Sequence, residues 1–351
     1  FVDMGQQDVD NLTPQACLPH LLEDSDPNWR TGYFYPGTVE GGSNCYVDTL
    51  MGNNIGFNYT FFKRDLDMDG KTRSWVNRFG YGEGEALPRL FDWVDEQLQF
   101  PDARIFTTLA TTATHEHWGV PDDFPKKHYT DTVDASNYLN SARYTDQQLE
   151  KLYNGLEERG LLDSSLFIIQ GDHGPRISPQ GYQVQEHHGR NLRAPWVVRP
   201  PRGNRIALDM KPYALWNSLD VLPTILDALG FQESVISSYP GSSLLRPLRT
   251  SQITGYRHHT YHVHNPGGRW PTVQQGPYKL ILMYNILDTT GSPTPCAVDI
   301  SVDPEEDYLW CFETGWQEVI DPQTGEVSTG QALYKGQESW LQNWAKSNCR
   351  T

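Results

Sequence analysis

The chain has 351 residues and a formal net charge of −16, from 28 Lys and Arg against 44 Asp and Glu. Its hydrophobic content of 37%, together with 30 glycines, is typical of a globular protein and excludes a disordered chain. The acidic balance argues against general nucleic-acid binding, which needs a basic face, and no apolar run reaches the roughly 18–20 residues of a membrane helix.

Apolar spacing predicts helices and strands in alternation. Leu90, Val94 and Leu98 lie on one helical stripe, and Gly160 is placed to end the longest helical pattern. In chain order we expect a helix at 86–100, a strand at 104–112, a helix at 133–160, strands at 165–170 and 194–199, and a helix at 216–229. This order predicts an α/β fold with a mostly parallel central sheet and helices on both of its faces.

The character of the sequence changes near residue 231, where helical patterns give way to turns, aromatic residues and shorter strands such as 278–283. We therefore predict an α/β core at 1–230 and a small C-terminal α+β subdomain at 231–351. Residues 1–85 are rich in Gly, Asn and Asp, and we expect them to form irregular structure around the first strands of the sheet.

Five cysteines show neither CxxC nor Cys/His zinc spacing, which favours disulfides over a zinc site. The predicted bridges are Cys17–Cys45 and Cys296–Cys311, the second pair flanking a turn-containing segment. The odd residue, Cys349, then needs a partner in another chain or in a missing segment. Five reduced, buried cysteines are the alternative.

Two triplets, Asn11-Leu-Thr and Asn58-Tyr-Thr, are acceptor sequons for N-glycans. With the cysteines and an abundance of Trp and Tyr, they favour a secreted or cell-surface glycoprotein over a cytosolic enzyme. We predict glycans on Asn11 and Asn58; the alternative is that both triplets arose by chance.

The segment Gly171-Asp172-His173-Gly174 follows a short apolar strand. In an open α/β sheet, ligands bind beyond the carboxyl ends of the strands, and the glycines allow a sharp turn that brings both side chains toward one ion. A carboxylate and an imidazole supply a hard oxygen and a borderline nitrogen to a divalent metal. We predict that Asp172 and His173 bind one divalent cation (Ca²⁺, Mg²⁺, Mn²⁺ or Zn²⁺). The alternative is a surface turn capped by the Asp.

Two further histidine clusters flank predicted strands. His115 and His117 follow the strand at 104–112, while Glu186-His187-His188-Gly-Arg190 precedes the strand at 194–199. Solvated loop histidines are the alternative in both places. The residues assigned to substrate binding are His117, Arg176, His187 and Arg190. Without Walker glycines or a dinucleotide fingerprint, such a set suits hydrolysis of an anionic ester, because cations stabilise charge on the ester oxygens.

Several segments occur in an order that resembles a known family. They are the Gly32-Tyr33 and Gly56-Phe57 steps, the Thr-rich segment 111–118, Tyr138–Leu149, Leu156–Asp163, Gly171–Gly174, Asp220–Gly230, Gly276–Lys279 and Asp303–Glu306. Over most of the chain this order resembles the sulfatase branch of the alkaline phosphatase superfamily, and it looks closest to sulfatase-like and lipoteichoic-acid-synthase-like members.

The resemblance implies an alkaline-phosphatase-like fold and one divalent metal held by an Asp-His pair, here Asp172 and His173. It matches His115 to the histidine that contacts a substrate oxygen, and His188 to a basic active-site residue of some members. His115 and His188 are therefore the candidate catalytic residues, and the implied partner is a sulfated or phosphorylated ester.

The sequence departs from the family pattern at the nucleophile, which in the family is a formylglycine from a C/S-x-P-x-R motif or a Thr. Cys17-Leu-Pro-His-Leu21 has Leu where Arg is needed and lies too close to Gly32-Tyr33, so we reject Cys17 as the nucleophile. The histidine that the family places after the Gly-Tyr step is missing as well. Either residues upstream of Phe1 carry the nucleophile, or the fold has been retired to a structural role. The retained Asp172, His173 and His115 favour the first explanation.

These expectations describe an extracellular, metal-dependent hydrolase of sulfate esters. Because the nucleophile is not in the sequence, a phosphoester hydrolase or phospho-transferase of the same superfamily is the first alternative. A non-catalytic structural glycoprotein on the same fold is the second.

Overall fold

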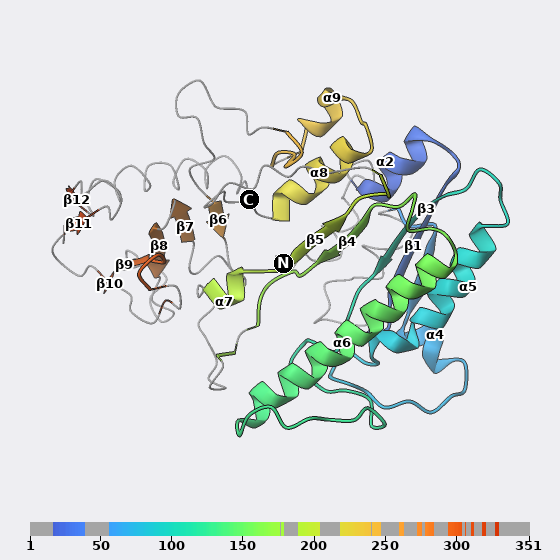
Figure 1. Cartoon of the computed structure of the whole chain (residues 1–351), viewed down its shortest axis with the longest axis horizontal. Helices are drawn as coiled ribbons and strands as arrows, with labels where there is room; N and C mark the ends of the chain where they lie inside the picture. The colour runs from blue at the N-terminus through green and yellow to red at the C-terminus, as the bar shows by residue number, and fades with distance from the viewer. Residues whose placement is uncertain are drawn as a thin grey trace, which may run out of the picture. The chain divides into compact units, whose positions relative to one another are not determined.

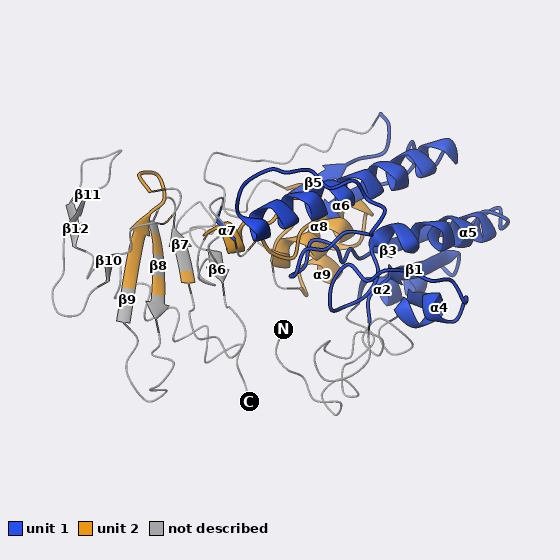
Figure 2. Ribbon diagram, turned by 90° about the horizontal axis from the view of Figure 1, so that it is seen from below, with its two compact units in different colours: residues 1–169, 177–183, 196–205 blue, residues 170–176, 184–195, 206–351 orange. Residues whose placement is uncertain are grey.

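The computed structural model describes residues 17–38, 56–175, 177–178, 189–203, 218–239, 241–246, 260–262, 272–275, 278–283, 294–303, 306, 310–311, 318–320 and 327–329 (Figure 1). The chain divides into two compact units (Figure 2). Unit 1 comprises residues 1–169, 177–183 and 196–205, and unit 2 comprises 170–176, 184–195 and 206–351. The predicted boundary at residue 230 stays a prediction.

A parallel sheet forms the centre of unit 1. It contains β1 (Trp29–Tyr35), β2 (Tyr59–Phe62) and β3 (Arg104–Leu109) in the order β2-β1-β3. Residues 31–34 of β1 are all buried, as expected for the middle strand of a sheet that is covered on both faces. The predicted α/β fold with a parallel sheet is confirmed, and the segment predicted to be irregular contributes two of its strands.

Five helical elements accompany this sheet in unit 1. They are α2 (Leu18–Ser25), α4 (Lys63–Asp67), the short 3-10 helix η2 (Glu83–Glu85), α5 (Leu87–Gln97) and α6 (Val133–Glu158). The core joins Phe34 of β1 to Leu90, Trp93 and Val94 of α5, and the Phe34 and Trp93 ring centroids lie 5.7 Å apart. Burial of these four side chains contributes roughly 1.5–3 kcal/mol each. The helices predicted at 86–100 and 133–160 are confirmed with slightly shorter bounds.

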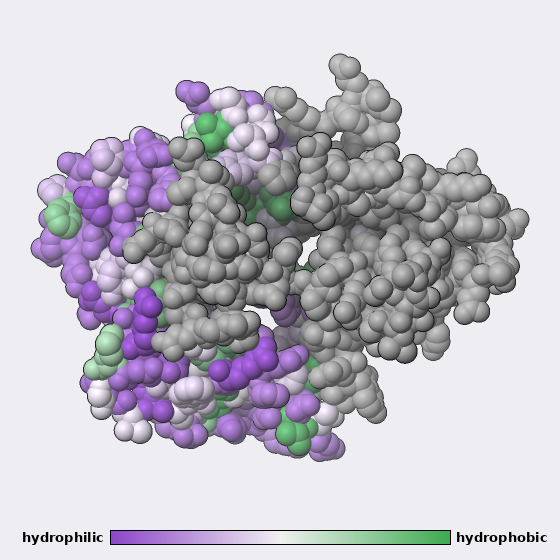
Figure 3. All heavy atoms as spheres, turned by 180° about the vertical axis from the view of Figure 1, so that it is seen from behind, coloured by the Kyte–Doolittle hydropathy of each residue, from purple (hydrophilic) through white to green (hydrophobic). Residues whose placement is uncertain are grey.

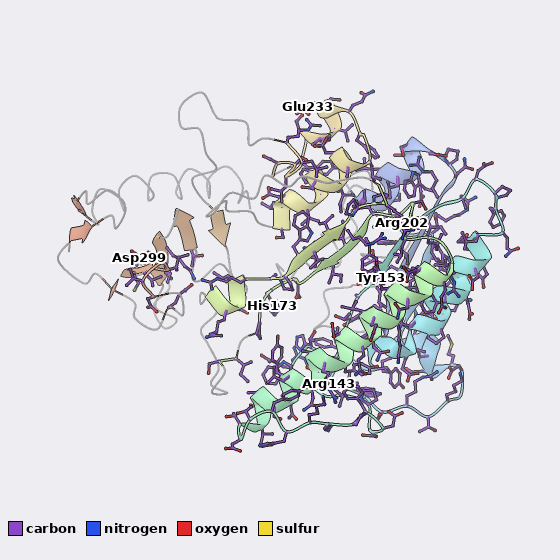
Figure 4. The ribbon with its side chains drawn as sticks, in the orientation of Figure 1. Arg143, Tyr153, His173, Arg202, Glu233 and Asp299 are labelled. Atoms are coloured by element: carbon purple, nitrogen blue, oxygen red, sulfur yellow. The ribbon has the colours of Figure 1, made fainter. Side chains whose placement is uncertain are left out.

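Two more predicted strands, β4 (Phe167–Gln170) and β5 (Trp196–Arg199), form a hydrogen-bonded pair. We expected them in one sheet with β3, and this was wrong for the part of the chain that the structure describes, where the pair is a separate sheet. Among the described residues, side-chain packing connects β4 to the core of unit 1. Tyr153 of α6 packs edge-on against Phe167 of β4 with ring centroids 5.8 Å apart, and Phe167 packs against the core of unit 1 (Figure 4).

Unit 2 carries an antiparallel sheet in the order β10-β9-β8-β7-β6. Its strands are β6 (Thr260–His262), β7 (Thr272–Gln275), β8 (Tyr278–Met283), β9 (Thr294–Asp299) and β10 (Trp310–Cys311), and a separate pair is formed by β11 (Glu318–Ile320) and β12 (Val327–Thr329). Its helices are α7 (Gly189–Leu192), η3 (Ser218–Asp220), α8 (Val221–Ala228) and α9 (Glu233–Ile236). The helix predicted at 216–229 is thus present as η3 and α8.

Polar residues predominate on the described part of one face of the molecule (Figure 3). On the face drawn in Figure 3, hydrophilic residues predominate and hydrophobic ones form isolated spots, in keeping with the net charge of −16. Within the described ranges, no helix is long and apolar enough to cross a bilayer.

Candidate functional site

The loop of residues 171–174 follows β4 and lies directly against α7 within unit 2. The backbone N–H of Gly174 donates to the carbonyl oxygen of Asn191 at 2.8 Å. Gly174 is buried, and a Cβ at this position would overlap the backbone carbonyl of Arg190. Only glycine allows so close an approach. The position of the 171–174 loop therefore depends on α7, beside which His173 is drawn in Figure 4.

Asp172 and His173 present two metal-binding donors side by side. The Oδ2 of Asp172 lies 3.7 Å from the Nε2 of His173, and the two side chains are 81% and 52% exposed. The Nδ1 of His173 lies 2.8 Å from the carbonyl oxygen of Gly174. A carbonyl only accepts, so Nδ1 carries the hydrogen, and in the neutral ring Nε2 keeps its lone pair for a ligand. The Oδ1 of Asp172 accepts the His173 backbone N–H at 2.9 Å, which leaves Oδ2 for the same ion.

This donor set fits a divalent metal, because it combines an exposed carboxylate oxygen with a neutral imidazole nitrogen whose tautomer is fixed. In the described part of the chain no group of three or more His, Cys, Asp or Glu side chains is placed to hold a metal. If Asp172 and His173 bind a metal, they would supply two ligands of a larger coordination sphere.

The second histidine segment, residues 111–118, follows β3 in unit 1 and is called the His115 loop below. The backbone N–H of His115 donates to the carbonyl of Thr112 at 3.0 Å, and the imidazole Nδ1 lies 2.9 Å from the carbonyl oxygen of Glu116. The Phe79 ring contacts the imidazole edge-on, with centroids 4.5 Å apart. As at His173, Nδ1 must be the donor, so Nε2 is an acceptor in the neutral ring and a donor in the imidazolium. His115 is half-buried, whereas His117 is exposed.

A buried carboxylate that sequence reasoning missed lies beneath the His115 loop. Glu83 has no exposed surface, and its Oε2 accepts the backbone N–H groups of Thr112 and Ala113, both at 3.2 Å. These partners are 29 and 30 residues away in the chain. Because Glu83 stands in a Gly-Glu-Gly-Glu run that is typical of an exposed turn, no local signal marked it.

A buried ion pair supports α7 from the C-terminal sheet. Lys279 Nζ of β8 lies 2.6 Å from Glu306 Oε2, and each side chain is 2% exposed. Burial lowers the pKa of Lys279, the Glu306 carboxylate opposes this shift, and the charge of Arg193 adds to it. The other carboxylate oxygen of Glu306 fills the space where a Cβ of Gly189 would stand. The ion pair thus joins β8 to the residue that packs against α7. The helix α7 in turn contacts the 171–174 loop through Asn191.

Comparison with known proteins decides the family. The family model named Sulfatase matches residues 2–231, which is well over half of the chain. This chain belongs to the sulfatase family. The predicted resemblance is therefore confirmed, and the 171–174 loop and the His115 loop both lie within the matched region.

Curated relatives of this sulfatase-family chain match it over part of its length. Lipoteichoic acid synthase 2 of Bacillus subtilis is 33% identical over 111 residues, which is 31% of this chain and 14% of that protein. Lipoteichoic acid synthase of Staphylococcus saprophyticus is 30% identical over 175 residues, which is 44% of this chain and 24% of that protein. The matches thus span less than a quarter of either relative.

Solved structures of low sequence identity share the fold. The lipoteichoic acid synthase LtaP from Listeria monocytogenes has a TM-score of 0.56 at 16% identity, over 81% of this chain and 65% of that one. A protein in the alkaline phosphatase superfamily from Vibrio parahaemolyticus has a TM-score of 0.52 at 13% identity, over 98% and 73%. These likenesses support the architecture of the sulfatase-family chain.

The predicted site residues fall in both units. His115 and His117 lie in unit 1, whereas Asp172, His173 and Arg190 lie in unit 2, where the 171–174 loop contacts the helix that carries Arg190. Their convergence on one cleft stays a prediction. The predicted residues outside the described part of the chain are Asn11, Cys45, Arg176, His187 and His188.

The cysteine predictions have different outcomes. Cys17 has a free thiol at the start of α2, so the predicted bridge to Cys45 is wrong. Half-burial raises the pKa of Cys17, which keeps the thiol protonated and agrees with its rejection as the nucleophile. Cys296 is disulfide-bonded, and the register of β9 and β10 places Cys311 opposite it. The Cys296–Cys311 bridge itself stays a prediction.

Proposed function

We propose that this sulfatase-family chain carries the metal-binding part of an extracellular enzyme that cleaves an anionic ester. The observation that carries the proposal is the exposed pair of donors at Asp172 and His173, each with its second polar atom already bound to the loop backbone. Such preorganisation of ligands is typical of metal sites. Sulfate esters are the first substrate class, because the family model is that of sulfatases.

The residues of the site would divide the work. Asp172 Oδ2 and His173 Nε2 would hold the cation, which when bound supplies positive charge close to the ester oxygens. His115, held at Nδ1 by the Glu116 carbonyl, would donate from Nε2 to a substrate oxygen as the imidazolium. Arg190, with the neighbouring His187 and His188, would contribute further positive charge for an anionic group in a protein of net charge −16.

Phosphoester hydrolysis or phospho-transfer is the second candidate. The curated relatives that share 30–33% identity with segments of this chain are named lipoteichoic acid synthases. The same donors suit either ester, since sulfate and phosphate groups both present anionic oxygens to a metal and an imidazolium. The nucleophile would distinguish them, and the C/S-x-P-x-R motif of the family does not occur in these 351 residues.

Metal titration and turnover test the proposal on the same variants. Calorimetric titration with Mn²⁺ should show binding to the wild-type protein and to His115→Gln, and no binding to Asp172→Ala. Hydrolysis of 4-nitrophenyl sulfate and 4-nitrophenyl phosphate, assayed on full-length protein, should be lost in Asp172→Ala and lowered by about 10²–10³-fold in His115→Gln. Asp163→Ala is the matched control, since it removes an exposed carboxylate near β4.

The outcomes separate the candidates. Hydrolysis of the sulfate alone supports a sulfatase, and hydrolysis of the phosphate alone supports the phosphoester reaction. Unchanged Mn²⁺ binding in Asp172→Ala would overturn the metal assignment. Absence of both Mn²⁺ binding and turnover in the wild-type protein would favour the structural glycoprotein.

A further inference from the structure

We propose that Glu83 is a positioning residue for His115, acting through the backbone at the end of β3. The role of Glu83 rests on the proposed function, because the position of His115 matters for the reaction only if the imidazole contacts the substrate. The described hydrogen-bond partners of this carboxylate lie 29, 30 and 62 residues away in the chain.

The contacts of Glu83 use both of its carboxylate oxygens. Oε2 accepts the N–H groups of Thr112 and Ala113, each at 3.2 Å, and Oε1 accepts the hydroxyl of Thr145 on α6. The Thr112 hydroxyl has a closer acceptor in the carbonyl of Tyr81, at 2.5 Å, than in Glu83 Oε2, at 3.5 Å. The carboxylate therefore accepts hydrogen bonds from two consecutive backbone N–H groups and from one hydroxyl on α6.

The peptide group between Thr112 and Ala113, whose N–H is bound by Glu83, also holds His115 directly. The carbonyl oxygen of Thr112 accepts the backbone N–H of His115 at 3.0 Å and the side-chain amide of Asn77 at 2.6 Å. Asn77 in turn accepts the N–H of Phe79 at 2.9 Å, and the Phe79 ring packs edge-on against the imidazole of His115. A shift of the Thr112 peptide would thus move both the backbone of His115 and the ring that packs on it.

The burial of Glu83 gives these contacts their strength. The side chain has no exposed surface, and among the described residues its hydrogen-bond partners are backbone N–H groups and hydroxyls. Hydrogen bonds to a buried acceptor are costly to break, since the side chain finds no water to replace a lost partner. Glu83 therefore fixes the direction in which the chain leaves β3.

Three variants test this role. Glu83→Gln keeps an oxygen for the two N–H groups while its amide donates to Thr145, whose hydroxyl turns round to accept. Glu83→Ala removes every contact. Glu85→Gln, in the same turn, changes an exposed carboxylate that pairs with Arg73, and serves as the matched control.

Hydrogen exchange and histidine NMR are the readouts that need no turnover. In Glu83→Ala, exchange in peptides covering residues 110–118 should accelerate about tenfold, and the imidazole resonance of His115 should shift, while peptides from β1 keep their protection. Glu83→Gln and Glu85→Gln should resemble the wild-type protein. Faster exchange spread through unit 1 in Glu83→Ala, or unchanged exchange at 110–118, would overturn the proposal. Because neither readout depends on activity, failure of the proposed function would show separately, as absence of turnover in the wild-type protein.

Kinetics separate a positioning role from independent catalysis. In the active protein, Glu83→Ala should lower kcat about tenfold with a change in KM of less than about twofold, and Glu83→Gln should restore kcat. Adding Glu83→Ala to His115→Gln should lower kcat no further, because residues that act through one group are not additive. Full additivity of the two losses would refute the assignment.

Discussion

Replacing Lys279 by Met is expected to destabilise unit 2 by about 3–5 kcal/mol, because the Glu306 carboxylate would stay buried without its cation. The two charged groups lie 2.6 Å apart and each side chain is only 2% exposed, so water cannot take the place of the missing partner. Replacing both residues by Met is expected to recover most of the loss, since apolar replacement of a whole buried pair is often neutral.

Urea unfolding followed by intrinsic fluorescence measures both effects, and Mn²⁺ titration shows whether α7 still supports the 171–174 loop. The control is Arg202→Met, which removes an exposed ion pair to Asp163 with side chains 75% and 56% exposed, and which should cost no more than about 1 kcal/mol. A loss of under about 1 kcal/mol in Lys279→Met would refute the reasoning. So would a double variant as unstable as the sum of its two single variants.

Two further predictions concern unit 2. Gly174→Ala should abolish Mn²⁺ binding in calorimetric titration while unit 1 stays folded, because the new methyl group would overlap the Arg190 carbonyl; retained binding would show that the loop tolerates displacement from α7. The hydrogen bond from Arg246 lowers the pKa of Asp227 against the opposing effect of burial. An unfolded Asp titrates at about pH 4, so the contribution of Asp227 to stability is complete above that pH and is lost as the pH falls through the lower folded-state pKa. Asp227→Asn should therefore flatten the acid limb of a plot of unfolding free energy against pH, and an unchanged limb would contradict this linkage.

Local apolar spacing was sufficient to predict most helices and strands. The 26-residue helix α6 repeats its apolar residues over enough positions to define a helical period, and the strand β8 contains a short continuous apolar run. The strand β1 (Trp29–Tyr35) was missed because it is buried on both faces. Its sequence therefore shows neither the apolar–polar alternation of a half-buried strand nor the apolar spacing of a helix. Which strands share a sheet depends on contacts between distant residues, and the separate pairing of β4 and β5 followed from nothing in their own sequences.

In the candidate site too, local sequence predicted some residues, whereas the roles of others depend on contacts between distant residues. Asp172, His173 and His115 were predicted because the residue types that bind metals and anions stand at strand ends, where the α/β topology places ligands. Glu83 was missed because its role comes from partners about 30 and 62 residues away. The pairing of Cys17 with Cys45 was wrong because spacing alone does not determine which cysteines meet.

The grouping of residues 170–176 and 184–195 with everything after 206 has a consequence for synthesis of the protein. On a ribosome, the 134 residues from His173 to Glu306 take roughly 7–27 s to appear at about 5–20 residues per second. Until Glu306 is made, α7 would lack the residue that packs between it and β8, and the 171–174 loop would lack that support. The proposed metal-binding donors Asp172 and His173 would therefore reach their final positions late, after the parallel sheet of unit 1 has emerged. A fragment ending at residue 231, where the family match ends, would contain both donors but not the strand β8 that supports them.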